Sequence, residues 1–289
     1  MVDDRPGNGR GNGAGNRGGG DDRRPPRTGR DAGPYRGKPG GQPPRSGGPN
    51  RGRPSQPRPD RRDGDQGDRQ AGPPIPNEIE ANQLAPDIRR ELSTLDKTTA
   101  DVIARHLVAA GELLDEDPEA ALAHAKAART RSGRIAAVRE AVGIAAYRCG
   151  DWAQALAELR AARRMGSKSA LMALIADCER GVGRPERAIE LARTPEAEAL
   201  TGDDADELRI VIAGARADMG QMEQALAVLT SPPLDPKRVG STAARLFYAH
   251  AEALLALERK EEALQWFLSA ARSDVEGITD AEERIDELT

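Results

Sequence analysis

Residues 141–159 read AVGIAAYRCGDWAQALAEL, and this stretch of the 289-residue chain decides the fold. Its apolar residues recur at helical spacing on both sides of Gly150-Asp151, without the alternation of period two that is typical of strands. Gly150 can adopt the left-handed conformation that ends a helix, and the Asp151 side chain can accept from the free amides that begin the next helix. The stretch therefore predicts two helices joined by a tight turn.

The same kind of break recurs along the chain from Asn77 onward. Further breaks occur at Glu116-Asp117-Pro118, Gly183-Arg184-Pro185 and Gly220-Gln221. Proline suits the first turn of a helix, where a missing amide hydrogen costs nothing. The recurrence predicts an internal repeat of helix, turn and helix.

Two small residues mark each copy of the repeat. An alanine about five positions after each turn recurs at spacings of 34, 33, 37 and 38 residues, as Ala121, Ala155, Ala188, Ala225 and Ala263. A second small residue lies twelve positions before each of these, as Ala109, Gly143, Ala176, Ala213 and Ala251. Small residues at both places predict two closely packed helices, because a larger side chain forces helix axes apart. We expect leucine at Gly143 to be destabilising and alanine there to be mild.

A unit of about 34 residues with this pattern resembles the tetratricopeptide repeat, whose signature is W-x2-L-G-x2-Y, then A-x3-F, then P. The second unit carries Val142-Gly143, Trp152 and Ala155 with Leu159, and the last carries Phe247 and Ala263 with Phe267. The chain departs from the signature where the opening Trp is Arg139, Met172 or Arg209, and where the closing Pro is missing. The resemblance implies an all-α fold, a right-handed solenoid of helical hairpins preceded by a long disordered tail.

This resemblance divides the folded part, residues 75–289, into five units. We expect them at 102–135, 136–168, 169–205, 206–243 and 244–273, with capping helices near 84–95 and 280–288. The two long spacings fall in connections 194–206 and 230–241, which we expect to be loops between units.

Residues 1–74 have a different composition, with 19 Gly and 13 Pro. They contain too few apolar residues to offset an ordering cost of roughly 1–2 kcal/mol per residue, so we expect a disordered tail. The tail carries 16 basic and 9 acidic residues, a net charge of +7, which leaves −11 for residues 75–289 of a chain with net charge −4.

A basic tail favours two interpretations, a solvating arm or a nucleic-acid-binding arm. With Tyr35 as its only aromatic residue, the tail can neutralise phosphates but offers little stacking on bases. The candidate nucleic-acid-binding residues are Arg17, Arg23, Arg24, Arg36, Arg51, Arg53, Arg61 and Arg62.

Chemistry-bearing motifs are missing from the sequence. His106, His124 and His250 lie far apart, and we interpret them as structural; no Ser-His-Asp order, HExxH, CxxC or phosphate-binding loop occurs. We therefore expect no enzyme, no metal and no cofactor. No stretch reaches the roughly 20 apolar residues that span a bilayer, so we expect no membrane partner. Two cysteines and no signal peptide favour the cytoplasm, and the Arg-rich, Ala-rich composition is typical of a bacterial protein.

The leading hypothesis is a non-catalytic scaffold that binds a protein partner. The resemblance implies that the first helix of each unit lines a concave groove, where interfaces favour Tyr and Arg. The candidate groove residues are Glu140, Ile144, Tyr147, Arg148, Asp177, Arg180, Glu207, Ile210, Arg245, Tyr248 and Glu252. Glu140 and Ile144 stand where family members that clamp a peptide carboxylate have Lys and Asn, which argues against that subtype. The alternatives are an RNA- or ribosome-associated adaptor that uses the tail, and a regulatory subunit of an enzyme.

Overall fold

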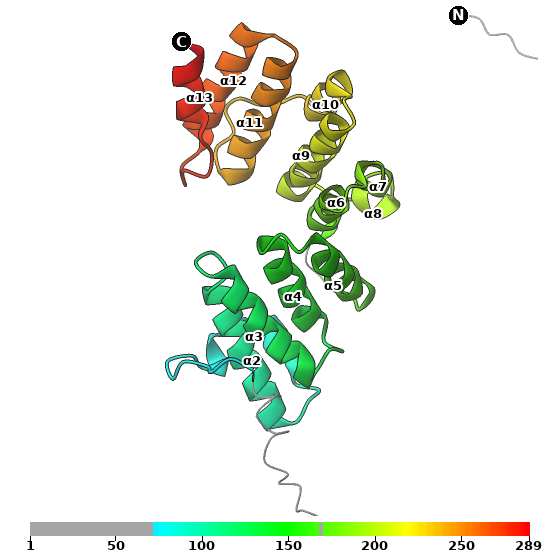
Figure 1. Cartoon of the computed structure of the whole chain (residues 1–289), viewed down its shortest axis with the longest axis vertical. Coiled ribbons are helices and arrows are strands. Elements are labelled where there is room, and N and C mark those ends of the chain that lie inside the picture. The colour runs from blue at the N-terminus through cyan, green and yellow to red at the C-terminus, as the bar shows by residue number, and fades with distance from the viewer. Residues whose placement is uncertain (1–71, 168–169) are drawn as a thin grey trace, which may run out of the picture. The chain divides into compact units, whose positions relative to one another are not determined.

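Pairs of helices joined by tight turns follow one another along the chain (Figure 1). The computed structural model describes residues 72–167 and 170–289, and in this part of the chain the regular structure is helical throughout. The pairs are α2 (Lys97–Glu112) with α3 (Pro118–Arg131), α4 (Ala136–Arg148) with α5 (Trp152–Arg164), α6 (Met172–Gly181) with α7 (Pro185–Leu191), α9 (Gly202–Asp218) with α10 (Met222–Leu229), and α11 (Ser241–Ala256) with α12 (Lys260–Ser273). The remaining elements are a 3-10 turn (Ala81–Gln83), α1 (Pro86–Leu92), α8 (Pro195–Glu198) and α13 (Ala281–Leu288).

The predicted all-α array of helical hairpins is confirmed. The predicted disordered tail lies outside the described residues, except for its last three positions. The bounds of the tail, the five units and the capping helices stay predictions.

The turns form as their sequences indicate. Gly150 ends α4 in the left-handed region with φ of 72°, and the Asp151 side chain accepts a hydrogen bond of 3.0 Å from the Gln154 amide. Asp117 caps α3 in the same way, accepting from the Ala120 amide at 3.0 Å, and Pro118 is the first residue of that helix. Local capping therefore fixes where these helices begin and end.

The small residues lie where paired helices approach each other. Ala121, Ala155, Ala188 and Ala263 have no exposed surface. A Cβ built on Gly143 of α4 would stand 2.7 Å from Leu159 Cγ and 3.1 Å from the Leu159 amide nitrogen of α5. Both distances are shorter than normal contacts, so the structure favours a destabilising effect of alanine at this position over the mild one expected from the sequence.

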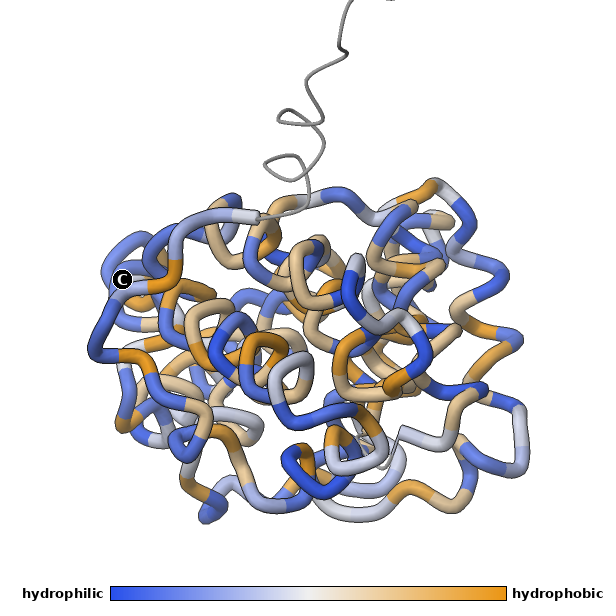
Figure 2. The backbone as a smooth tube through the Cα atoms, turned by 90° about the horizontal axis from the view of Figure 1, so that it is seen from below, coloured by the Kyte–Doolittle hydropathy of each residue, from blue (hydrophilic) through white to orange (hydrophobic). Residues whose placement is uncertain are grey.

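The core consists of the apolar faces turned inward by these pairs. Figure 2 shows hydrophobic and hydrophilic residues alternating around the helical turns, as in amphipathic helices. Phe247 and Phe267, the aromatic residues that match the repeat signature in the last unit, are fully buried between α11 and α12. Trp152 is partly buried, and its ring lies where a Cβ on Gly181 would be 2.5 Å from Trp152 Cγ.

Three buried carboxylates on this array each have two arginine partners. They are Glu158 with Arg129 and Arg139, Glu179 with Arg160 and Arg184, and Asp206 with Arg209 and Arg238. The carboxylates expose only 6%, 2% and 6% of their surface. Because an unpaired buried charge is costly, these arginines offset the cost of burying the three carboxylates.

The histidines differ from the sequence expectation. His106 of α2 and His124 of α3 are not far apart but in direct contact, with their Nδ1 atoms 3.0 Å apart and both rings buried. In this contact one imidazole donates and the other accepts. Burial lowers the pKa of both rings, to about 4 for His106, so the pair is neutral at pH 7. The structural interpretation of the two residues fits this arrangement.

The connection at 194–206 also differs from the expected loop. It contains the single turn α8, and α9 already begins at Gly202. Thr194 caps α8 by accepting from the Ala197 amide. The other connection, residues 230–240, has no helix, in keeping with its prolines 232, 233 and 236.

Candidate functional site

The candidate groove residues lie on the first helices of the pairs, α4, α6, α9 and α11. Counted from the small residue of each helix, Glu140, Ile210 and Tyr248 stand three positions before it, and Ile144, Asp177 and Glu252 stand one position after it. Equivalent positions on successive helices place these side chains on one repeated surface. We call this surface the first-helix face.

Charged residues of the first-helix face pair with the next unit along the chain. Each pair joins residues about one repeat apart: Asp115 with Arg148, Arg180 with Asp218, Glu207 with Arg245, and Glu252 with Arg284. Arg284 belongs to α13 and contacts Glu252 at 2.8 Å. The face therefore carries a series of ion pairs that connect neighbouring units.

The densest part of this series spans α4, α6 and α9. The Tyr147 hydroxyl donates to Asp177 Oδ2 at 2.5 Å, and Arg180 Nη1 donates to Asp177 Oδ1 at 2.8 Å. Arg180 Nε also donates to Asp218 Oδ2 at 2.8 Å. Burial and the hydrogen bond to Asp177 raise the pKa of Tyr147, so its hydroxyl stays protonated. Burial opposes the charge of Arg180, but the carboxylates of Asp218 and Asp177 outweigh that effect and raise its pKa.

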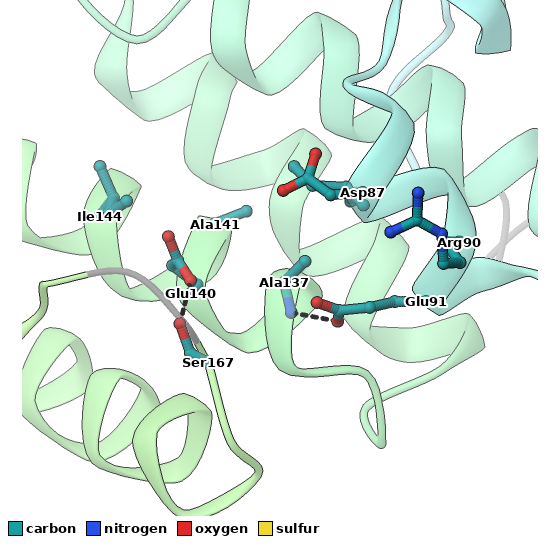
Figure 3. Close-up of a pocket in the computed structure, with 9 residues that line it drawn as sticks. Asp87, Arg90, Glu91, Ala137, Glu140, Ala141, Ile144 and Ser167 are labelled. Atoms are coloured by element: carbon teal, nitrogen blue, oxygen red, sulfur yellow. Dashed lines mark hydrogen bonds between the residues drawn. The ribbon is translucent and has the colours of Figure 1, made fainter.

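A cavity of about 340 Å³ lies between α1 and α4 (Figure 3). Glu140, Ile144, Ala137 and Ala141 of α4 line it together with Ile88, Glu91 and other residues of α1. Glu91 accepts a hydrogen bond of 3.2 Å from the Ala137 amide and so caps α4, which has no cap of its own. The Ser167 hydroxyl donates to Glu140 at 2.7 Å. At this end of the first-helix face, the segment preceding the repeats therefore lines the same cavity as the predicted groove residues Glu140 and Ile144.

A second cavity, of about 380 Å³, lies between α9 and α11 and is called here the α9–α11 cavity. Four candidate groove residues line it: Arg180, Ile210, Tyr248 and Glu252. The rest of its lining is apolar or small: Ala213, Gly214, Ala217, Met222, Ala225, Leu229, Ala249, Ala253 and Ala256. It thus combines an apolar floor with a few polar groups, the usual composition of a binding site.

The polar groups around the α9–α11 cavity are held by neighbouring side chains. Arg180 is fixed by Asp177 and Asp218, as described above, and its guanidinium lies over Gly214, where a Cβ would be 2.6 Å from Arg180 Cζ. Burial and a hydrogen bond to Asp280 raise the pKa of Tyr248. Side chains held in place lose little conformational entropy when a ligand binds.

The sequence predicted which helices carry the groove residues, but it did not predict several of the residues that pair with them. Asp115, Asp218, Asp280 and Arg284 were not among the candidates, although each pairs with a candidate residue or hydrogen-bonds to it. The available signal was spacing, because the oppositely charged partners lie 32 to 38 residues apart, close to the repeat length. The eight candidate arginines of the tail lie outside the described residues.

Other site types are not found in the described part of the chain. Residues 72–167 and 170–289 contain no group of three or more His, Cys, Asp or Glu placed to hold a metal ion. No helix within those ranges is long and apolar enough to cross a membrane.

The fold and site define an all-α array of helical hairpins with a cavity on the face of its first helices. No protein-family model and no curated protein matches the chain. Among solved structures, one similar chain is described as "Crystal structure of YrrB: a TPR protein with an unusual peptide-binding site". The two chains are 19% identical, with a TM-score of 0.41, and the alignment covers 69% of this chain and 97% of that one.

Proposed function

We propose that the chain is a non-catalytic interaction scaffold that binds a segment of another protein on its first-helix face. The observation that carries the proposal is the α9–α11 cavity. It gathers Arg180, Ile210, Tyr248 and Glu252 around an apolar floor, on the helices where the repeat pattern placed a groove.

The energetics of the cavity support binding of a peptide side chain. Apolar surface buried from water contributes roughly 25 cal/mol per Å², and the floor of alanines offers such surface. The rim groups are already oriented by Asp177, Asp218 and Asp280, so binding orders few additional side chains. Both features favour affinity without any chemical step.

We place this scaffold in the cytoplasm of a bacterium. Both cysteines, Cys149 and Cys178, are free thiols, which suits a reducing compartment. Burial raises the pKa of Cys178 to about 12, so that thiol is unreactive. Fractionation of the source cells tests the location.

Filling the cavity tests the proposed function. Ala217→Leu and Ala249→Leu each put a larger side chain into the cavity lining, whereas Ala157→Leu makes the same change at an exposed position of α5. The tagged full chain and each variant are used for affinity purification, with mass spectrometry of the bound proteins. We expect a partner that is retained by the wild type and by Ala157→Leu and lost with both cavity variants. A set of bound proteins that is identical for all four chains contradicts the proposal.

A further inference from the structure

We propose that the α9–α11 cavity takes one bulky apolar side chain from a peptide segment that also carries Lys or Arg beside it. This inference rests on the proposed function and specifies the chemistry of its ligand. Three observations carry it: the many small residues that line the cavity, the excess of carboxylates in the ion pairs of its charged lining residues, and the position of Arg284.

Small residues make up most of the lining that α9 and α11 give to the cavity. Gly214 and Ala217 of α9 face a cavity that Ala249 and Ala253 of α11 line from the other helix. A volume of about 380 Å³ is at the lower end of the range of small ligand sites, roughly 300–1,000 Å³, which suits a single side chain better than a whole helix. In this proposal, an apolar side chain of the ligand fills the space that the small lining residues leave open.

Carboxylates outnumber cations in the ion pairs that hold the two charged lining residues, Arg180 and Glu252. The cations are Arg180 from α6 and Arg284 from α13, and they pair with Asp177, Asp218, Glu252 and Glu287. Four acids against two bases leave an excess of negative charge in these pairs, and residues 75–289 as a whole carry −11. Such a surface favours a cationic segment and steers it during association.

The carboxylates that pair with Arg180 and Arg284 remain accessible to a second cation. The side chain of Asp218 is 41% exposed and that of Glu252 is 39% exposed, even though each already contacts an arginine. A carboxylate has about four lone-pair sites and can accept from more than one donor. Each can therefore receive a ligand cation in addition to its own arginine.

Arg284 shows that a cationic side chain fits beside the carboxylate of Glu252. Its guanidinium contacts the Glu252 carboxylate at 2.8 Å and stands 5.6 Å from the centre of the Phe267 ring. The chain thus already places one cationic side chain, from α13, against a carboxylate that lines the cavity. Arg180 does not serve an anionic ligand in the same way, because two carboxylates already neutralise it.

Selection from random peptides tests the inference without a known partner. Random 12-residue peptides displayed on filamentous phage are selected on the immobilised full chain, and the enriched sequences are synthesised and measured by fluorescence anisotropy. We expect enriched peptides with one Leu, Met, Phe or Trp flanked by Lys or Arg. Their affinity should fall at least about 10-fold with Ala217→Leu, the loss typical of a blocked anchor side chain, and stay unchanged with Ala157→Leu.

Charge variants test the cationic part separately. Asp218→Asn and Glu252→Gln keep the size of each side chain and remove its charge, and we expect each to weaken binding by about 2- to 5-fold at low salt, the range of an exposed ion pair. Circular dichroism melts of each variant confirm that the chain is folded.

The outcomes separate this inference from the proposed function. Enriched peptides that are acidic or uncharged, and that lose affinity with Ala217→Leu, overturn the cationic ligand while leaving a peptide-binding scaffold. Peptides insensitive to Ala217→Leu overturn the cavity as the site. A selection without any enrichment overturns both proposals.

Discussion

Replacing Gly143 with alanine tests the close packing of α4 on α5. The added Cβ would stand 2.7 Å from both Leu159 Cγ and Leu159 Cδ2, and 3.1 Å from the Leu159 amide nitrogen. Leu159 is fully buried, so its side chain has no open space into which to move. Overpacking of this kind costs about 1–3 kcal/mol, against a gain of up to about 1 kcal/mol from replacing glycine in a helix. We expect a net destabilisation of up to about 2 kcal/mol.

Gly111 of α2 is the matched control. It is also helical, and a Cβ there would meet nothing within 4 Å, so Gly111→Ala should be neutral or stabilising by up to about 1 kcal/mol. Urea denaturation of the full chain, followed by helical circular dichroism, gives both changes in the free energy of unfolding. Their difference, about 1–3 kcal/mol, isolates the overlap with Leu159, because the propensity terms largely cancel. Equal stabilisation by both alanines would refute the close approach of α4 and α5.

Three further predictions concern a buried histidine, a buried carboxylate and the close approach at Gly181. Burial and nearby positive charge hold the pKa of His106 near 4, below its ordinary 6.5. Its contribution to the free energy of unfolding is therefore full above about pH 6.5 and declines as the pH falls toward 4. The slope is at most about 1.4 kcal/mol per pH unit. Urea melts between pH 5 and 7.5 should show this slope, and His106→Gln should reduce it; an unchanged slope means that His106 is not the titrating group. Glu179→Gln removes the charge that Arg160 and Arg184 share and should lower the free energy of unfolding by about 1–3 kcal/mol in denaturant melts. The control, Glu190→Gln, lies in an exposed pair with Arg187 and should change it by no more than about 0.5 kcal/mol. Equal effects would show that burial of Glu179 is unimportant. Gly181→Ala should lower the thermal midpoint, because its Cβ would be 2.5 Å from Trp152 Cγ; a raised midpoint contradicts that contact.

Local signals made most of the fold predictable. The glycines and aspartates found at the turns act through hydrogen bonds within a few residues, so the cap at Asp151 was predictable from sequence alone, and Asp117 forms the same cap. The buried alanines were found in the same way, because their spacing repeats. The change in stability caused by a methyl group at Gly143 depends instead on the distance from Gly143 to Leu159. The periodicity of the sequence does not give that distance.

Contacts between helices were harder to predict. The sequence assigned Tyr147, Asp177 and Arg180 to one surface but did not show that they bind one another. Likewise, His106 and His124 stand 18 residues apart and meet only because α2 and α3 fold back on each other. Such pairings depend on the separation of helices in space, whereas helical periodicity gives only the direction of each side chain.

The position of the α9–α11 cavity follows from one comparison of equivalent residues. One and four positions after its small residue, α4 carries Ile144 and Tyr147, and α6 carries Asp177 and Arg180. The same two positions of α9 are Gly214 and Ala217, the smallest residues available. Gly214 leaves room for the Arg180 guanidinium, and Ala217 leaves part of the space beside α11 unfilled. Under the proposed function, a ligand that fills this space would meet an arginine already held by two carboxylates, so its affinity would come from apolar contact and from the open sides of Asp218 and Glu252. The ion pairs that join successive helix pairs would then also decide which charge the proposed binding surface accepts.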